Sequence, residues 1–296
     1  MINREAVRNI ALTTLLIVLA IGGVLFGKWW RNRPGPPQPP HLTVVFPAIS
    51  TGSPVIMQTP EGTVIAIDAG SLNDAQAMIA CYRRLGITRI DLLLITSHQY
   101  TALGGVPALI RSGITIRSVW QTRDPYKGRA YKAAMAAFQQ DNTSIRMVNA
   151  NDSIQVGARP FSLIVLWPPE HGDRSRDPLS CRIDYGNTAF LLHGSATGAS
   201  EQAILGSYGQ KLTSEGQYCI LQAAYHGAAS GTTPELLRWS TPEAAIISCQ
   251  ASDPPDPMTL HRLQAAGSSI WRTDTVGTIT VTADGVTAPE ISGSTQ

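Results

Sequence analysis

Lysine is scarce in this sequence of 296 residues, and charged residues of all kinds make up only 15% of it. Arginine carries most of the positive charge, because there are only four lysines, and the formal net charge is only +2. So mild a charge argues against a general affinity for nucleic acids or acidic substrates. The length allows one large domain or two small ones. Hydrophobic residues make up 43% of the chain, enough to form a sizeable core, so general disorder is not expected.

Cysteine is equally scarce, and no two cysteines form a C-x-x-C pair, so a zinc knuckle is not expected. We predict that the thiols are buried as small hydrophobic groups. The alternative is a disulfide in a domain outside the cytoplasm, with Cys219 and Cys249 as candidates because both lie in predicted core strands. The four residues are Cys81, Cys181, Cys219 and Cys249.

Charge is absent altogether from residues 10–27, an apolar run of 18 residues near the N-terminus. As a helix this run would be about 27 Å long, close to the roughly 30 Å hydrocarbon core of a bilayer. Trp29 and Trp30 follow at once, where an interfacial aromatic belt is expected. The run is longer than the apolar part of a signal peptide and does not end in a good cleavage site. We therefore predict a retained transmembrane helix over 10–27, after a short flank at 1–9.

Residues 28–41 form a predicted linker rich in Trp, Arg and Pro. Five prolines lie between residues 31 and 40, which favours an extended, semi-rigid spacer. Positive charges flank the apolar run about equally, so the positive-inside rule does not decide its orientation. We expect an integral, single-pass protein of a bacterial plasma membrane, with the following domain on the outer side.

The pattern changes from residue 42 onward to short β-branched runs broken by Gly, Pro and Ser, alternating with helical periodicity. The run at 90–96 is apolar throughout, as expected for a strand buried on both faces. Two sets of strands with helices between them favour two sheets with helices outside, in one domain over 42–288. Residues 289–296 are polar and predict a flexible tail. Strands are expected at 42–48, 54–59, 63–70, 90–96, 116–122, 161–167, 180–186, 188–194, 218–224, 244–249, 268–273 and 278–283, and helices at 72–86, 102–113, 199–207, 233–239 and 257–266.

Five spaced motifs of this region resemble the metallo-β-lactamase-like domain that ends ComEC-type DNA-uptake proteins. LTVVFPAISTGSPVIMQTPEGTVIAIDAG resembles the opening of that domain, and LGITRIDLLLITSHQYTALGGVPALI resembles its central metal-binding stretch. LSCRIDYGNTAFLLHGSA, YCILQAAYHGAASG and the stretch at 244–281 resemble its three later motifs. The resemblance covers residues 42–282 in order, and it implies an α/β fold, an αββα metallo-β-lactamase-like sandwich.

The chemistry of that family uses two metal ions, usually zinc, held by His and Asp side chains at the sheet ends. Aligned with the family's motifs, this sequence keeps His98 as the first histidine of the central run. Tyr100, Ala102 and Leu103 stand where two aspartates and a second histidine would be. Ser195 replaces the bridging aspartate, so the carboxylates expected at the metals are missing from their places.

The resemblance leaves His98, His226 and Asp256 as candidate metal ligands, with His193 as a fourth. Three ligands and an open position would suffice for one catalytic zinc. Each residue also has a purely structural alternative role. His98 would be a strand-end histidine bonded to backbone, His226 a turn residue, and Asp256 a helix N-cap. Without the aspartates we expect a degenerate site, with no cofactor, or with zinc if the residual site holds a metal.

One stretch at 122–138 interleaves basic residues with tyrosines, a mixture that can bind phosphates and stack bases. A solvated helix face is the alternative interpretation. The residues concerned are Arg123, Lys127, Arg129 and Lys132.

Taken together, the sequence predicts a membrane-anchored, catalytically degenerate metallo-β-lactamase-like protein that acts as a binding or scaffold module. Other membrane proteins are its expected partners, with weak nucleic-acid contact as a further one. Two alternatives stay open: a one-metal zinc hydrolase of phosphodiester or ester bonds, and a DNA-binding module related to DNA uptake.

Overall fold

The computed structural model describes residues 41–124, 126–156, 161–169, 178–209, 212 and 216–294. The chain from residue 41 onward forms one compact unit. The predicted transmembrane run at 10–27 lies outside the described residues. Within the described part of the chain, no helix is both long enough and apolar enough to cross a bilayer.

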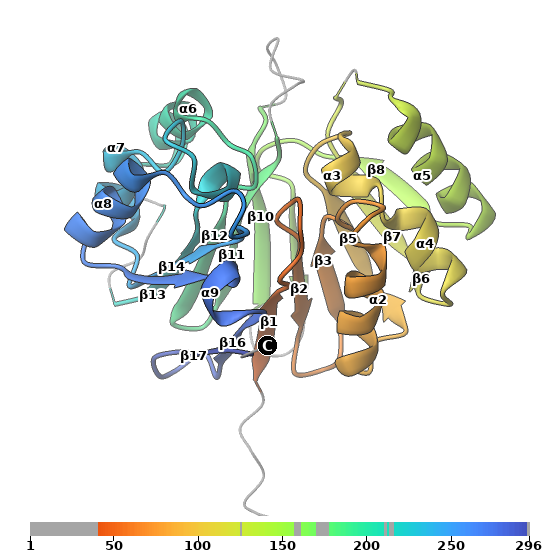
Figure 1. Cartoon of the computed structure of the whole chain (residues 1–296), viewed down its shortest axis with the longest axis horizontal. Helices are drawn as coiled ribbons and strands as arrows, with labels where there is room; N and C mark the ends of the chain where they lie inside the picture. Colours follow the sequence, from red (N-terminus) through yellow and green to blue (C-terminus); the bar gives the residue numbers. More distant parts are fainter. Residues whose placement is uncertain are drawn as a thin grey trace, which may run out of the picture. The chain divides into compact units, whose positions relative to one another are not determined.

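Two mixed sheets form the centre of the domain, and Figure 1 shows helices covering the outer side of each. The first sheet has the strand order β17-β16-β1-β2-β3-β5-β7-β8, in which β3, β5, β7 and β8 run parallel. Its strands are β1 (Leu42–Phe46), β2 (Val55–Gln58), β3 (Val64–Ile67), β5 (Leu92–Ile95), β7 (Ser118–Gln121), β8 (Ser144–Met147), β16 (Ile279–Ala283) and β17 (Glu290–Gly293).

The second sheet has the order β15-β14-β13-β12-β11-β10-β9, in which β12 to β15 run parallel. A separate short ladder joins β4 (Arg89–Ile90) to β6 (Thr115–Ile116). The strands of the second sheet are β9 (Ser153–Val156), β10 (Phe161–Trp167), β11 (Ser180–Tyr185), β12 (Thr188–Leu192), β13 (Tyr218–Gln222), β14 (Ala244–Ile247) and β15 (Ser269–Arg272).

Helices α2, α4 and α5 pack on the first sheet, and α6, α7 and α8 pack on the second. Two further short helices, α3 and α9, and the 3-10 segment η2 lie in connections after strands. The bounds are α2 (Ala75–Arg84), α3 (Tyr100–Leu103), α4 (Val106–Arg111), α5 (Arg129–Gln140), α6 (Gly198–Tyr208), η2 (Ala224–Gly227), α7 (Pro234–Ser240), α8 (Pro257–Ala265) and α9 (Thr273–Val276).

Strand alternation builds three hydrophobic layers from the same sequence runs. On β5, Leu92 and Leu94 face the second sheet, while Leu93 and Ile95 face the helices. Successive side chains of a strand point to opposite faces, so a strand between two layers must be apolar at every position. The predicted αββα arrangement of one domain is therefore what the packing shows.

The chain end differs from the expectation of a flexible tail at 289–296, because β17 extends the first sheet there. Thr280 lies opposite Ser292, and Ile291 of β17 packs against the inter-sheet core. One partly buried isoleucine and the free edge of β16 are enough to order a polar strand, and polarity alone does not reveal this. Strands β8 and β9 were not predicted either, since their residues are mostly exposed.

All four cysteines are buried free thiols, as predicted, so the alternative of a disulfide between Cys219 and Cys249 is wrong. Cys219 lies near the start of β13 and Cys249 just beyond the end of the neighbouring β14. Ile220 pairs with Ala244 in this parallel ladder, so the two cysteines stand about six residues, or about 20 Å, apart along it. A disulfide needs Cα atoms about 4.4–6.8 Å apart.

Candidate functional site

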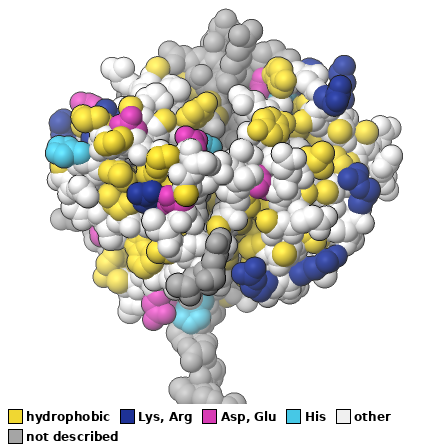
Figure 2. All heavy atoms as spheres, in the orientation of Figure 1, with side chains coloured by type: hydrophobic (Ala, Val, Ile, Leu, Met, Phe, Trp, Pro, Cys, Tyr) yellow, Lys and Arg dark blue, Asp and Glu magenta, His cyan; other side chains and the backbone are white. Residues whose placement is uncertain are grey.

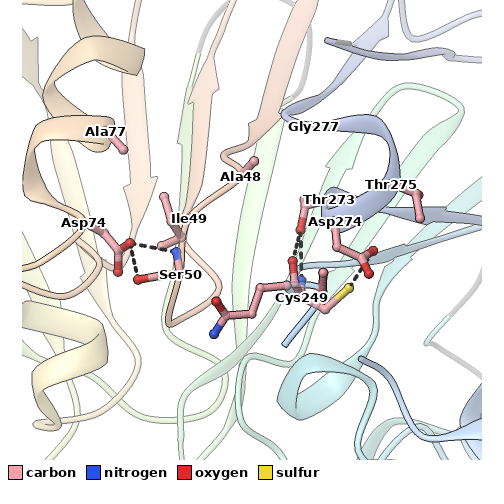
Figure 3. Close-up of a pocket in the computed structure, with 12 residues that line it drawn as sticks. Ala48, Ile49, Ser50, Asp74, Ala77, Cys249, Thr273, Asp274, Thr275 and Gly277 are labelled. Atoms are coloured by element: carbon pink, nitrogen blue, oxygen red, sulfur yellow. Dashed lines mark hydrogen bonds between the residues drawn. The ribbon is translucent and has the colours of Figure 1, made fainter. Parts of the chain in front are cut away.

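A cleft of about 420 Å³ lies where loops of the two sheets meet. Its walls come from the loop after β1, the start of α2, the segment after β14, and α9. Figure 3 shows the side chains of Asp74 and Ser50 on one wall and those of Cys249, Thr273 and Asp274 on the other. Ligand sites of open α/β sheets lie beyond the carboxyl ends of parallel strands, and this cleft adjoins those of β14 and β15.

Asp74 organises one wall of the cleft as a buried carboxylate that accepts five hydrogen bonds. Ser50 donates its backbone N–H and its hydroxyl to Oδ1 at 2.7 and 2.6 Å. Thr51 donates the same two groups to Oδ2 at 3.2 and 3.0 Å, and the hydroxyl of Ser71 donates at 2.6 Å. Burial alone would raise the pKa of Asp74, but the hydrogen bonds from Ser50, Ser71 and Thr51 outweigh it and lower the pKa.

The opposite wall contains a thiol that is held protonated. Cys249 Sγ donates to Asp274 Oδ1 at 3.2 Å, and the guanidinium of Arg272 binds the same carboxylate through both of its oxygens. Burial and the Asp274 carboxylate raise the pKa of Cys249 to about 11. A thiol in this state is a poor nucleophile and a poor metal ligand, because both roles need the thiolate.

His226 lines a small pocket that shares residues with the cleft. Its Nδ1 lies 2.7 Å from the carbonyl oxygen of Ser248, to which it donates, and 3.5 Å from the hydroxyl of Ser53. His226 and Tyr225 both adopt left-handed backbone angles, with φ of 58° and 49°. The left-handed turn holds the His226 ring against the carbonyl of Ser248, at the rim that the small pocket shares with the cleft.

His98 is fully buried, and protein atoms lie within hydrogen-bond distance of both its ring nitrogens. Nε2 lies 3.0 Å from Gln121 Oε1, and Nδ1 lies 3.1 Å from Lys127 Nζ. Nδ1 is also 3.1 Å from the carbonyl oxygen of Tyr126. Burial and the Lys127 ammonium lower the pKa of His98, so the ring is neutral. Donation from Nε2 to Gln121 and acceptance at Nδ1 from Lys127 then satisfy both nitrogens.

Asp256 is the N-cap of α8, which is the structural role predicted as the alternative to metal binding. Its Oδ1 accepts from the backbone N–H of Met258 at 2.8 Å, with Pro257 in the first turn. Its own backbone N–H donates to the carbonyl of Gly227 at 3.0 Å, which places it near the His226 turn.

The residues present do not fit the zinc site that the resemblance implies. His98, His226 and Asp256 are not assembled as a ligand set, because within the described ranges no three His, Cys, Asp or Glu side chains are grouped so as to hold a metal ion. The physical reason is that His98 and Asp256 are already bonded to protein, and an ammonium lies beside Nδ1 of His98. A divalent ion at that nitrogen would meet both repulsion and a competing hydrogen bond.

Asp68 and His193 are buried titratable groups outside the cleft. Burial raises the pKa of Asp68, which follows β3, to about 7, although Thr96 donates its backbone N–H and its hydroxyl to it at 2.8 and 2.6 Å. Burial lowers the pKa of His193, which follows β12, to about 4, and neither ring nitrogen has a hydrogen-bond partner among the described residues. The expected fourth ligand is thus a buried neutral histidine.

The Gly104-Gly105 pair of the central motif has a packing role. A Cβ at Gly105 would clash with the carbonyl oxygen of Ala69, and one at Gly104 would lie 2.9 Å from the backbone nitrogen of Leu72. Gly105 also donates its N–H to the carbonyl of Gly70 at 2.9 Å. These glycines let the α3–α4 turn approach the segment after β3, so the motif is explained without metal binding.

The predicted nucleic-acid residues are only partly available. Lys127 is engaged with His98, with the carbonyl oxygen of Asp124 at 2.8 Å, and with the ring of Tyr131. Arg123, Arg129 and Lys132 are exposed. Nucleic-acid contact through these residues stays a prediction.

Asp74 was not predicted as a site residue, although Ser71 and Asp74 have the spacing of a helix N-terminal capping pattern.

No family model matches the sequence, and no curated protein matches it. Among solved structures, it is similar to CmlA, a diiron β-hydroxylase from Streptomyces venezuelae, with 16% identity and a TM-score of 0.50 over 84% of this chain and 55% of that one. Yeast PDE1 follows with 9% identity and a TM-score of 0.48, over 78% of this chain and 97% of that one. A subclass B3 metallo-β-lactamase of Bradyrhizobium japonicum has 11% identity and a TM-score of 0.37, over 60% and 76%.

The chain thus spans about half the length of CmlA. At 16% identity the similarity to CmlA shows a shared fold and leaves activity and ligand open. The fold is that of a metallo-β-lactamase-like domain, as the sequence predicts.

Proposed function

We propose that the chain is a membrane-anchored binding protein, in which a metallo-β-lactamase-like domain recognises a ligand at the cleft without hydrolysing it. The cleft supplies hydrogen-bonding groups from two sheets, including Ser50, Gln250 and Thr275. Its size falls within the range of roughly 300–1,000 Å³ that is typical of ligand pockets. The resemblance to ComEC-type domains supports an origin in a DNA-uptake hydrolase.

The observation that carries this proposal is the state of His98, the one histidine kept from the central metal-binding run. A metal-ligating histidine coordinates through one ring nitrogen and donates from the other. In this structure Gln121 and Lys127 bind the two ring nitrogens, and the neutral ring is packed 4.4 Å from the ring of Tyr131. His98 therefore stabilises the turn between β7 and α5 and is not free for coordination.

Anchoring by residues 10–27 is the second part of the proposal and has its own test. We expect the full chain to stay in the membrane fraction after an alkaline wash, because an uncharged span of 18 residues inserts stably. A chain lacking residues 1–40 is the control and should be released. Release of the full chain by the same wash would contradict the anchor.

Hydrolysis is the measurement that separates a binding module from an enzyme. We expect fragment 41–296 with added zinc to cleave bis(4-nitrophenyl) phosphate and 4-nitrophenyl acetate no faster than zinc-containing buffer. The physical reason is that no described ligand set can hold the metal-bound water that this fold uses. Turnover above the buffer rate that is lost in both His98→Ala and His226→Ala would instead establish the one-metal hydrolase.

A further inference from the structure

A second groove, separate from the cleft, lies between α3, α4 and α5 and has a volume of about 490 Å³. Most of its lining is apolar and comes from small side chains, with Pro107 on α4 and Ala130 and Ala133 on α5. Two large hydrophobic side chains beside it are left in solvent: Leu72 is 60% exposed and Tyr100 is 53% exposed. Exposed apolar groups that gather around a hollow indicate a binding surface more strongly than scattered ones.

The charge around this groove has one sign. Arg111 at the end of α4 and Arg129 at the start of α5 both line it, and no acidic residue of the described part of the chain does. Neither arginine belongs to an ion pair among the described residues. An adjoining cavity adds Lys127, and its one carboxylate, Asp124, already accepts from the backbone N–H groups of His98 and Tyr126. The groove is therefore complementary to an anion.

Figure 2 shows the surface on this side of the domain. On the half of the molecule that carries α2, α3 and α4, hydrophobic side chains are spread over the surface, and lysine and arginine side chains lie toward its outer edge.

The chemistry of the lining favours an aliphatic chain over a peptide. A bound peptide brings backbone N–H and C=O groups that need partners. Pro107 has no N–H, and α4 and α5 use most of their backbone groups within the helices, so the groove offers few such partners. An alkyl chain needs none, and its burial against Tyr100, Ala130 and Ala133 is favourable in proportion to the apolar area covered.

We propose that this groove binds an anionic amphiphile, a molecule with one apolar chain and a carboxylate or phosphate head that Arg111 and Arg129 bind. Guanidinium groups bind carboxylates and phosphates through paired, charge-assisted hydrogen bonds. The same chemistry is found in a free fatty acid and in the headgroup of an anionic lipid. The inference goes beyond the proposed function, since the groove can bind whether or not the cleft holds a ligand or a metal.

The test is a calorimetric titration of fragment 41–296 with dodecanoate, at concentrations below the critical micelle concentration of dodecanoate. The fragment is one compact unit with its own hydrophobic layers, so it is expected to fold alone. We expect saturable binding with one site per chain. Dodecyltrimethylammonium has the same chain and a cationic head, and it should bind at least tenfold more weakly.

Two changes to the groove should each weaken dodecanoate binding at least tenfold. The double variant Arg111→Gln/Arg129→Gln removes the cationic partners, and Ala133→Trp fills the groove from an exposed position on α5, where the fold tolerates a large side chain. Arg117→Gln is the matched control, because Arg117 is an exposed arginine that lines a different cavity. It should bind dodecanoate like the parent.

Vesicles distinguish the two sources of the ligand. Co-sedimentation with phosphatidylglycerol vesicles, lost in the double variant, would assign a lipid headgroup, whereas dodecanoate binding without co-sedimentation would assign a free amphiphile. The proposal is overturned if dodecanoate does not bind saturably, or if the double variant and Ala133→Trp both bind it like the parent. Neither failure bears on the hydrolysis test, which probes the other site.

Discussion

Replacing Asp74 with alanine is expected to lower the free energy of unfolding by about 3 kcal/mol, the cost of stranding several donors to a buried carboxylate. Asp74 is 5% exposed and accepts from Ser50, Thr51 and Ser71 at 2.6–3.2 Å. Without it, the loop after β1 loses its attachment to α2, and the cleft loses one wall. Urea unfolding of fragment 41–296 measures the change.

Two variants sharpen the Asp74 prediction. Asp74→Asn keeps one acceptor oxygen and should show an intermediate loss. Asp141→Ala is a matched control, since that carboxylate accepts one backbone N–H, from Ile116 at 3.0 Å, and should cost about 1 kcal/mol. Because the folded pKa of Asp74 is lowered, its contribution is present above its ordinary pKa of 3.8 and is lost as the pH falls through its folded pKa. Equal losses for Asp74→Ala and Asp141→Ala would refute the proposed role.

Asp68 and His193 are expected to give the protein opposite pH dependences that hide one another. The folded pKa of Asp68 is raised from 3.8 to about 7, so its stabilising contribution is complete below pH 3.8 and is lost as the pH rises through 7. The folded pKa of His193 is lowered from 6.5 to about 4, so its contribution is complete above pH 6.5 and is lost as the pH falls through 4. Between about pH 4 and 6.5 the two slopes cancel.

Single variants should reveal each slope. Asp68→Asn keeps an acceptor oxygen for the Thr96 N–H, and its amide can donate to the Thr96 hydroxyl oxygen but cannot accept from that hydroxyl. Between pH 4 and 6.5 its stability relative to the parent should therefore rise by about 1.4 kcal/mol per pH unit. His193→Leu should change relative to the parent by the same amount in the opposite direction. Comparison with the parent cancels the contributions of other buried acids such as Glu201. Parallel stability curves for the parent and both variants across this range would contradict the buried pKa shifts.

The hydrophobic pattern predicted most of the fold because each layer leaves a local signal. The apolar run of β5 indicates a strand between two layers, and Thr233-Pro234 and Asp256-Pro257 mark the starts of α7 and α8. β17 could not be predicted in this way, because it is ordered by pairing with β16 and carries one partly buried apolar residue, Ile291. Strand ladders between distant segments are a tertiary property that a local pattern does not contain.

The site was predicted less completely, for the same reason. The resemblance to the family's motifs identified His98. The hydrogen-bond partners of its two ring nitrogens are Gln121 and Lys127, more than twenty residues further along the chain. Asp74 accepts hydrogen bonds from Ser50 and Thr51, which lie 24 and 23 residues before it in the sequence. The alternative of a disulfide between Cys219 and Cys249 was wrong because the sequence indicates core strands for both residues but not the parallel register that separates them. Spacing along a chain does not fix which side chains meet.

Zinc content distinguishes a degenerate site from a working metal site. Fragment 41–296, purified without chelator, incubated with excess zinc and freed of unbound metal by gel filtration, is analysed for zinc by elemental analysis. We expect well under one zinc per chain, because His98 is bonded through both ring nitrogens and Asp256 caps α8. One zinc or more per chain, lost in His98→Ala and retained in the control His261→Ala, would contradict it.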